Sequence, residues 1–133
     1  MVKVWINGTF DVLHIGHIKL LEFANSFGLV RVGLDSDNRI SKMKGKLRPF
    51  NNLKDRTEFI SCIKFVNSVV SFNTDSELLE EIKKYQPDIF VIGSDYKDKN
   101  IIGSEFSKQV IFFEKIKNKS TTEILNYGKT KNL

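Results

Sequence analysis

The feature that most constrains the fold is an uninterrupted passage from an apolar strand through a glycine turn into a helix. Residues 3–6 read Lys-Val-Trp-Ile, which predicts a short strand buried on both faces. Residues 7–17 follow without a spacer, and apolar residues then recur at helical spacing as far as Gly28. A helix that begins directly after a strand directs its first backbone N–H groups at one point, where they stabilise an anion. The sequence therefore predicts a phosphate site at this junction.

Two histidines, the only two in the chain, fall at the predicted helix start. His14 and His17 are three residues apart, so their imidazoles share one face of the helix and flank the same point. Gly16 between them has no side chain, which would let a ligand lie against the backbone. Taken alone, His-x-Gly-His is better explained by a polar helix start with a local glycine. The residues around it favour a functional site.

Composition predicts one globular domain. The 133 residues are 41% hydrophobic and 28% charged, ordinary values for a soluble protein, and we expect a domain over 1–128 with a short flexible tail over 129–133. No apolar run approaches the ~20 residues of a membrane helix, and the start of the chain does not resemble a signal peptide, so we expect a cytoplasmic protein without a membrane partner. The single cysteine, Cys62, excludes an internal disulfide, and its apolar helical surroundings predict a core position.

A cation-rich segment follows the second predicted strand. Its cations alternate with small or polar residues up to Pro49, and they are Arg39, Lys42, Lys44, Lys46 and Arg48. The net charge of +5 suits an anionic ligand and would equally suit nucleic acid. Apolar residues in this segment do not recur at the spacing of a helix or a strand. We therefore predict a loop that closes over phosphates. A solvated, mobile loop is the alternative.

The remaining pattern alternates strands with helices. Strands are predicted at 29–34, 68–72, 89–92 and 109–113, with helices at 50–65, from Asp75 to before Pro87, and from Ser120. This alternation predicts an α/β fold with a parallel sheet covered on both faces. If the first and fourth strands are neighbours where strand order reverses, residues 8–17 and 93–97 face one cleft.

A cation lies near the start of the predicted helix 50–65. Asn51 or Asn52 is the predicted cap, and Arg56 falls on the predicted exposed face. Cations usually avoid the N-terminal end of a helix, so an anionic partner is expected for Arg56.

The segment Gly8-Thr9-Phe10-Asp11, followed by His14-Ile15-Gly16-His17, resembles the signature of the cytidylyltransferase-like nucleotidyltransferases. The resemblance implies a Rossmann-like, three-layer α/β/α fold with a five-stranded parallel sheet of order 3-2-1-4-5. It also implies that the motif holds a nucleotide triphosphate and that the two histidines stabilise charge as the α-phosphorus is attacked.

Further matches extend over nearly the whole chain and resemble the adenylyltransferase module that acts on heptose 1-phosphate in bacterial surface-sugar synthesis. They are Lys44-Gly45-Lys46-Leu47-Arg48-Pro49, Arg56, residues 69–72, Pro87-Asp88, residues 93–97, residues 102–104 and Ser120-Thr121-Thr122. The resemblance implies transfer of a nucleoside monophosphate from a nucleoside triphosphate, with ATP favoured, to a phosphorylated sugar or polyol, with release of pyrophosphate. Glycerol-3-phosphate cytidylyltransferases, which use CTP, share fewer of these motifs and are the alternative.

The resemblance also assigns roles to residues. The catalytic group is His14, His17 and Lys44. Nucleotide contacts are assigned to Gly8, Thr9, Phe10, Asp11, Gly16, Asp95, Ser120, Thr121 and Thr122. Contacts to phosphate or acceptor are assigned to Lys46, Arg48, Arg56 and Lys115. The cytidylyltransferases carry an arginine where Lys115 stands, and an ammonium cannot reproduce a bidentate guanidinium contact, so the choice of base stays open.

Mg²⁺ is the expected cofactor, bound with the nucleotide because the sequence shows no dedicated protein cage for it. We expect a homodimer, as is common among relatives, and no nucleic-acid partner. Two other classes of function stay open. Residues 14–17 and 41–45 also resemble class I aminoacyl-tRNA synthetases, although the lysine segment lies far too early. A nucleotide-binding regulatory domain without turnover would lose a histidine or the basic segment, and this chain keeps both.

Overall fold

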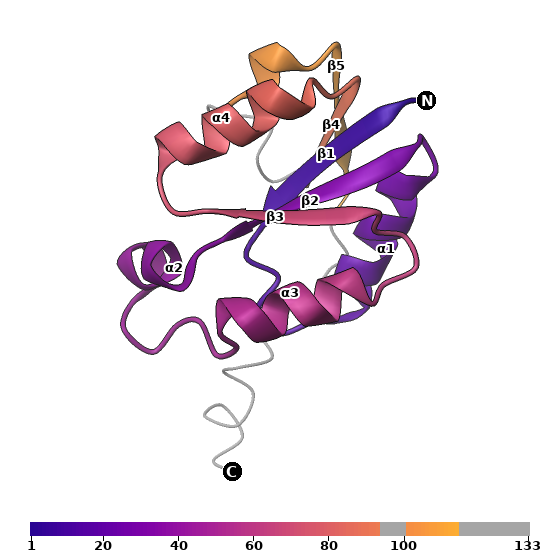
Figure 1. The fold of residues 1–133 in the computed structure, drawn as a ribbon. Coiled ribbons are helices and arrows are strands. Elements are labelled where there is room, and N and C mark those ends of the chain that lie inside the picture. Colours follow the sequence, from indigo (N-terminus) through magenta and orange to yellow (C-terminus); the bar gives the residue numbers. More distant parts are fainter. Residues whose placement is uncertain (94–100, 115–133) are drawn as a thin grey trace.

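The structure, a computed structural model, describes residues 1–93 and 101–114 and contains one parallel sheet. Its strands are β1 (Lys3–Gly8), β2 (Leu29–Asp35), β3 (Ser68–Phe72), β4 (Ile89–Gly93) and β5 (Gln109–Phe113), in the order β3-β2-β1-β4-β5 (Figure 1). Each strand lies where the sequence predicts it. The Rossmann-like α/β fold and its strand order are confirmed.

Helices cover both faces of the sheet. They are α1 (Ile15–Asn25), α2 (Asp37–Lys44), α3 (Leu53–Ser61), α4 (Asp75–Tyr85) and the short 3₁₀ helix η2 (Ser104–Phe106). Buried side chains of α1 and α3 pack against one face of β1 and β2, while α4 and the segment around η2 pack against the other. Figure 1 shows α4 on one side of the strands, with α1 and α3 on the opposite side. The molecule thus has the predicted three layers.

Polar caps set the starts of three helices. The side chains of Ser36, Asn52 and Thr74 each accept the backbone N–H three residues later, at α2, α3 and α4. At α4, Glu77 accepts the N–H of Asn73, the residue before the cap, whereas the predicted capping box would have it accept the N–H of Thr74.

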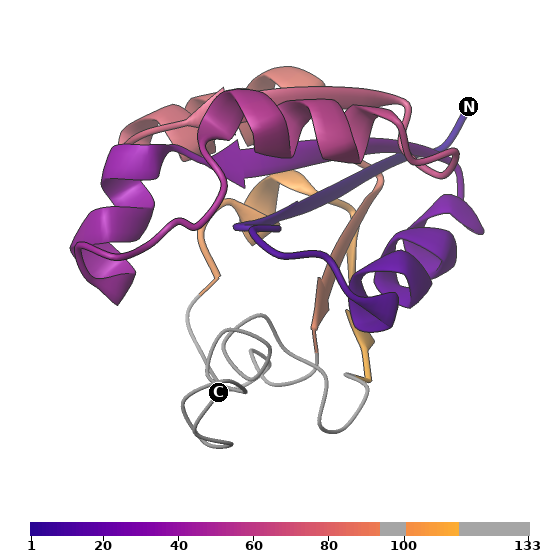
Figure 2. The ribbon, with the colours of Figure 1, turned by 90° about the horizontal axis from the view of Figure 1, so that it is seen from below.

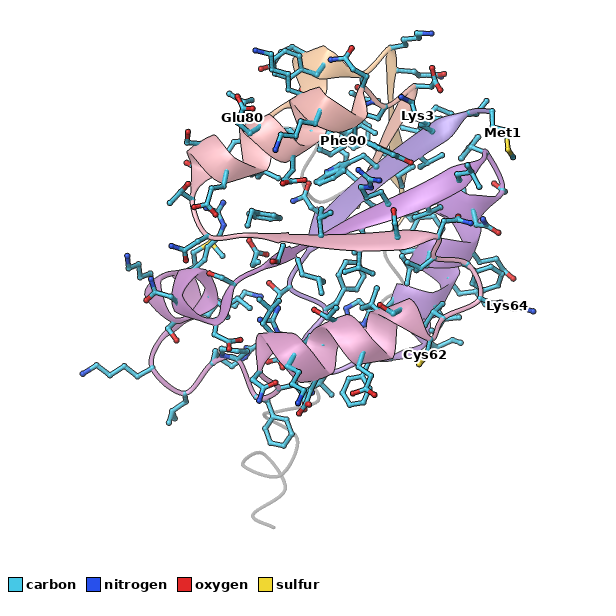
Figure 3. The ribbon with its side chains drawn as sticks, in the orientation of Figure 1. Met1, Lys3, Cys62, Lys64, Glu80 and Phe90 are labelled. Atoms are coloured by element: carbon cyan, nitrogen blue, oxygen red, sulfur yellow. The ribbon has the colours of Figure 1, made fainter. Side chains whose placement is uncertain are left out.

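Two predictions about this part of the chain are wrong. The predicted loop over 39–48 is helical up to Lys44, because Ser36 caps α2 and Ile40 is buried beneath it. Cys62 is exposed at the C-terminal end of α3, which stops at Ser61 and not at the predicted residue 65 (Figure 3).

Among the described residues, no helix combines the length and apolar character needed to cross a membrane.

Candidate active site

The site lies where strand order reverses, between β1 and β4. The parallel register of β1 with β2 runs along six residue pairs, whereas its register with β4 covers Val4↔Ile89 and Trp5↔Phe90. The C-terminal ends of β1 and β4 therefore point apart (Figure 2). Ligands of parallel α/β sheets bind beyond such diverging carboxyl ends. The predicted adjacency of the first and fourth strands is confirmed, and residues 94–97 lie outside the described residues.

The two histidines form a reciprocal cap at the start of α1. His14 Nδ1 accepts the backbone N–H of Gly16 at 3.0 Å, and His17 Nδ1 accepts the backbone N–H of His14 at 3.2 Å. Their ring centroids are 4.0 Å apart with an interplanar angle of 32°. The imidazoles therefore share one face, as the spacing predicts. Because Nδ1 is an acceptor in both rings, the proton of each neutral imidazole is on Nε2.

Small and aromatic residues shape the space around this pair. A Cβ on Gly16 would lie 2.7 Å from His14 Cε1, so the glycine makes room for the His14 ring. The predicted reason for this glycine was close approach of a ligand, and the contact found is with the protein's own imidazole. Phe10, at φ +47° and 5% exposed, packs its ring 5.3 Å from that of His17. A Cβ on Gly8 would lie 3.1 Å from that Phe10 ring. The Phe10 ring therefore packs against the His17 imidazole and restricts its position.

Asp11 joins the histidine motif to the basic segment. Its carboxylate is buried and accepts the backbone N–H groups of Phe50 and Asn51, each at 2.7 Å. Arg48 Nε lies 3.3 Å from Asp11 Oδ2, and Asn51 Nδ2 donates to the Asp11 carbonyl at 2.7 Å. These contacts bring residues 37 to 40 positions apart together.

Arg56 is fully buried, so the prediction of an exposed position is wrong. Its Nη1 donates to the carbonyls of Thr9 and Asp35, and its Nε donates to that of Asn51. Its Nη2 pairs with Asp37 at 2.7 Å. The anionic partner expected for this cation is therefore a carboxylate of the protein. Arg56 therefore supports the motif loop from within.

A second set of polar contacts fixes the start of α2. Arg39 pairs with Asp35 and Asp75, each at 2.8 Å, and Thr9 Oγ1 donates to Asp35 at 3.3 Å. Burial lowers the pKa of Arg39, but its hydrogen bonds to Asp75 and Asp35 outweigh this effect and raise the pKa above the ordinary arginine value. Sequence reasoning missed the role of Asp35. The signal was available, because Asp35 ends β2 beside the motif end of β1.

The predicted phosphate ligands lie just beyond this anchored start. Lys44 ends α2, and Lys46 follows it after Gly45, whose φ is +103°. Lys44 and Lys46 are exposed, and Arg48 is tied back where Ser41 Oγ donates to its carbonyl at 2.7 Å. The other predicted contacts, Asp95, Lys115, Ser120, Thr121 and Thr122, lie outside the described residues.

Metal ligands do not gather in the described part of the chain, where no group of three His, Cys, Asp or Glu side chains could hold an ion. The nearest candidate, Asp11, has both carboxylate oxygens engaged by Arg48 and two backbone amides. The described residues do not fit a protein-held Mg²⁺.

Comparisons with known proteins agree with the fold and identify the family. A family model described as Cytidylyltransferase-like matches residues 5–126. The bifunctional protein HldE of Campylobacter fetus is 43% identical over 124 residues, and that of Sulfurimonas denitrificans is 41% identical over 123 residues. Each alignment covers 92% of this chain but 27% and 26% of those relatives, so the chain spans about a quarter of their length.

Solved structures show the same fold. A lipopolysaccharide core biosynthesis protein from Thermoplasma volcanium matches with a TM-score of 0.72 and 24% identity, covering 87% of this chain and 98% of that one. A protein of unknown function from Archaeoglobus fulgidus matches with a TM-score of 0.66 and 22% identity, covering 90% and 94%. At these identities the likeness concerns the fold alone. The histidine motif, the sheet order and the family match over 5–126 together lead to one conclusion: the chain belongs to the cytidylyltransferase-like family.

Proposed function

We propose that this protein is a nucleotidyltransferase that moves a nucleoside monophosphate from a nucleoside triphosphate, with ATP favoured, to the phosphate of a phosphorylated sugar or polyol. Family membership supports the reaction class. The similarity to HldE proteins, together with the motifs shared with the heptose 1-phosphate adenylyltransferase module, supports the choice of nucleotide and acceptor. We expect the protein to act in the cytoplasm, on soluble phosphorylated metabolites.

The histidine pair is the observation that carries the proposal. Backbone N–H groups hold Nδ1 of both His14 and His17, so each neutral ring has its proton on Nε2 and can act as a donor but not as a base through that nitrogen. A donor is what the reaction needs. A phosphate monoester has a second pKa of about 6, so near neutral pH the acceptor is already a dianion and requires no general base.

The chemistry then reduces to alignment and charge stabilisation. An oxygen of the acceptor phosphate attacks the α-phosphorus, a new P–O bond forms, and the bond from the α-phosphorus to the bridging oxygen breaks with departure of pyrophosphate. Negative charge spreads over the α-phosphoryl oxygens during this exchange. The Nε2–H groups of His14 and His17, together with the Lys44 ammonium, are the groups that we assign to stabilise it.

The remaining ligands complete the proposal. Gly8, Thr9 and Gly16 line the motif beside the nucleotide, while Asp95, Ser120, Thr121 and Thr122 are assigned to it by their motifs. Lys46, Arg48 and Lys115 are assigned to the phosphates. Mg²⁺ would accompany the triphosphate and neutralise part of its charge. We expect the active protein to be a homodimer.

Pyrophosphate release tests the function directly. ATP, CTP, GTP and UTP are each combined with heptose 1-phosphate, glycerol 3-phosphate and related phosphates, with His17→Ala as the inactive control and Lys54→Ala, an exposed change on α3, as the active one. We expect turnover with at least one pair, led by ATP and heptose 1-phosphate. Turnover led by CTP and glycerol 3-phosphate would select the alternative. Nucleotide or RNA binding without pyrophosphate release from any pair would contradict the proposal.

A further inference from the structure

Arg48 lies where the basic segment meets the histidine motif, and one of its nitrogens has no acceptor. Its side chain is 13% exposed, and its Nε lies 3.3 Å from Oδ2 of the fully buried Asp11 carboxylate. Among the residues that the structure describes, Arg48 Nη2 is the buried side-chain nitrogen without a hydrogen-bond partner. Folded proteins rarely leave such a donor unpaired, and a functional role is one of the few explanations for it.

Asp11 does not supply the missing acceptor. Its Oδ1 accepts the N–H of Asn51, and its Oδ2 accepts both the N–H of Phe50 and Arg48 Nε. The carboxylate therefore holds the guanidinium by one nitrogen, while two backbone N–H groups, one on each oxygen, fix its own position. A buried carboxylate that is itself held in place can orient the guanidinium group of Arg48.

The surrounding charge indicates which kind of group accepts a hydrogen bond from Arg48 Nη2. Lys44 and Lys46 precede Arg48 on the same short segment, and both side chains are exposed. Asp11 balances the charge of Arg48, so the two lysines leave a net positive potential on this segment. A planar guanidinium edge on a segment that also carries two lysines suits oxygens of a phosphate or polyphosphate.

We propose that Arg48 Nη2 donates to a phosphate oxygen of the substrate, and that Asp11 is a positioning residue that orients this guanidinium and makes no contact of its own with the nucleotide. The inference rests on the proposed function in naming the ligand as substrate. It departs from the motif-based assignment of Asp11 to nucleotide binding.

The segment before Arg48 has few packing contacts that would oppose entry of that oxygen. Leu47 is 88% exposed, and no heavy atom lies within 4 Å of the position that a Cβ on Gly45 would take. A small shift of residues 45–47 therefore breaks no apolar packing. The side-chain bond from Ser41 to the Arg48 carbonyl and the Asp11 contacts limit how far the arginine travels.

Calorimetric titration with inorganic tripolyphosphate and, separately, with glycerol 3-phosphate tests the contact. We compare the wild type with Arg48→Ala, with Arg48→Lys, which keeps the cation and most of the stem, and with Lys54→Ala as a matched loss of one exposed positive charge. We expect Arg48→Ala to weaken binding of at least one probe by about tenfold or more, with a smaller loss in Arg48→Lys and none in Lys54→Ala. The probe affected identifies which phosphate Arg48 binds. Unchanged affinity for both probes in the folded Arg48 variants would overturn the contact.

A double-mutant cycle tests the role of Asp11. If Asp11 acts through Arg48, Asp11→Asn weakens the same probe, and the Asp11→Asn, Arg48→Ala double variant loses no more affinity than Arg48→Ala alone. Additive losses would instead show that Asp11 contacts the ligand itself. Failure of the proposed function is distinguishable: a wild type that binds tripolyphosphate through Arg48 but releases no pyrophosphate keeps this inference and loses the function. An active transferase whose Arg48 variants bind both probes like the wild type would keep the proposed function and overturn this inference.

Discussion

His17 has two separable roles, one for each ring nitrogen. Its Nδ1 accepts the N–H of His14 and so helps to begin α1, whereas its Nε2–H is the group that we assign to the reacting phosphate. Asparagine reproduces the position of Nδ1, and glutamine reproduces that of Nε2. We therefore expect His17→Ala to lower kcat by about 10²-fold, which is ~2.7 kcal/mol, with His17→Gln more active than His17→Asn.

Thermal unfolding separates these roles of His17. His17→Asn keeps an acceptor for the His14 N–H, so we expect it to be the more stable of the two amide variants although it is the less active. Activity and stability that fell in parallel across the three variants would show that the imidazole serves only to cap the helix.

Arg56 is the buried charge on which the motif loop depends. Replacement by methionine would leave the carbonyls of Thr9, Asp35 and Asn51 without this donor and Asp37 without its partner. We expect Arg56→Met to lower the free energy of unfolding by about 3–5 kcal/mol. Urea denaturation followed by fluorescence of the buried Trp5 measures the loss. Lys54→Met, an exposed change two residues away on α3, is the control and is expected to stay close to the wild type.

The residue scale also shows where sequence reasoning is limited. A spacing of three residues is a local property, so the paired imidazoles of His14 and His17 could be predicted from it. The environment of Arg56 could not, because its acceptors lie as far as 47 positions away in the chain. A local pattern places a cation at a helix start on the surface, whereas here the motif loop and the end of β2 surround it.

At the scale of elements, α2 connects the sheet to the lysines that we assign to phosphate and is attached mainly through its N-terminal end. Ser36 Oγ accepts the N–H of Arg39 and contacts Asn73, and the helix buries the side chain of Ile40. We expect Ser36→Ala to cost about 1 kcal/mol and, because Lys44 lies at the far end of α2, to raise the KM for a phosphorylated substrate.

Thr74→Ala supplies the matched control for α2. Thr74 caps α4 with the same geometry, a side-chain oxygen accepting the N–H three residues later, and its loss is expected to cost a similar ~1 kcal/mol. Because α4 carries none of the assigned phosphate ligands and reaches α2 only through its first turn, where Asp75 pairs with Arg39, we expect KM to rise less in this variant than in Ser36→Ala. Equal KM values in the two cap variants would show that the position of Lys44 does not depend on the start of α2.

The elements differ in how visible they are in the sequence. The five strands are compact β-branched and aromatic runs bounded by polar residues, and α4 has both a capping-box sequence and inward apolar spacing. By contrast, α2 buries one side chain, that of Ile40, and a single buried position has no period to detect. Its polar anchors come from β2, α3 and the start of α4, so only the folded chain brings them together.

For the whole molecule, the site depends on how the strands β3-β2-β1 are joined to β4-β5. Alternating strands and helices predict parallel pairing, but the order 3-2-1-4-5 followed from the family resemblance and not from the pattern itself. That order makes β1 and β4 neighbours, and their short register lets the C-terminal ends diverge around the histidine motif. Contacts that hold the opposite, N-terminal end of this junction therefore affect the entire sheet.

Asp88 is the side chain that holds that end. Its Oδ2 accepts the backbone N–H of Lys3 at 2.8 Å, and its Oδ1 pairs with Lys108 at 3.1 Å, so it links the start of β1 with the segments leading into β4 and β5. The backbone hydrogen bond from Lys3, followed by that from Lys108, holds the pKa of Asp88 below its ordinary value of 3.8. Because the native pKa is lower than the unfolded one, this stabilisation is present above the unfolded pKa and is lost as pH falls through the native pKa.

We therefore expect Asp88→Asn to be less stable than the wild type at neutral pH and to converge with it as the pH falls to about 2, since protonated Asp88 resembles the amide. Urea unfolding followed by Trp5 fluorescence at a series of pH values measures both curves. Glu80→Gln, at a solvent-exposed position on α4 (Figure 3), is the control and is expected to follow the wild type throughout. A gap between Asp88→Asn and wild type that stayed constant down to the lowest pH would mean that the Asp88 charge does not hold the strands together. The junction would then depend on packing of Trp5 and Phe90, which are buried on the face covered by α4.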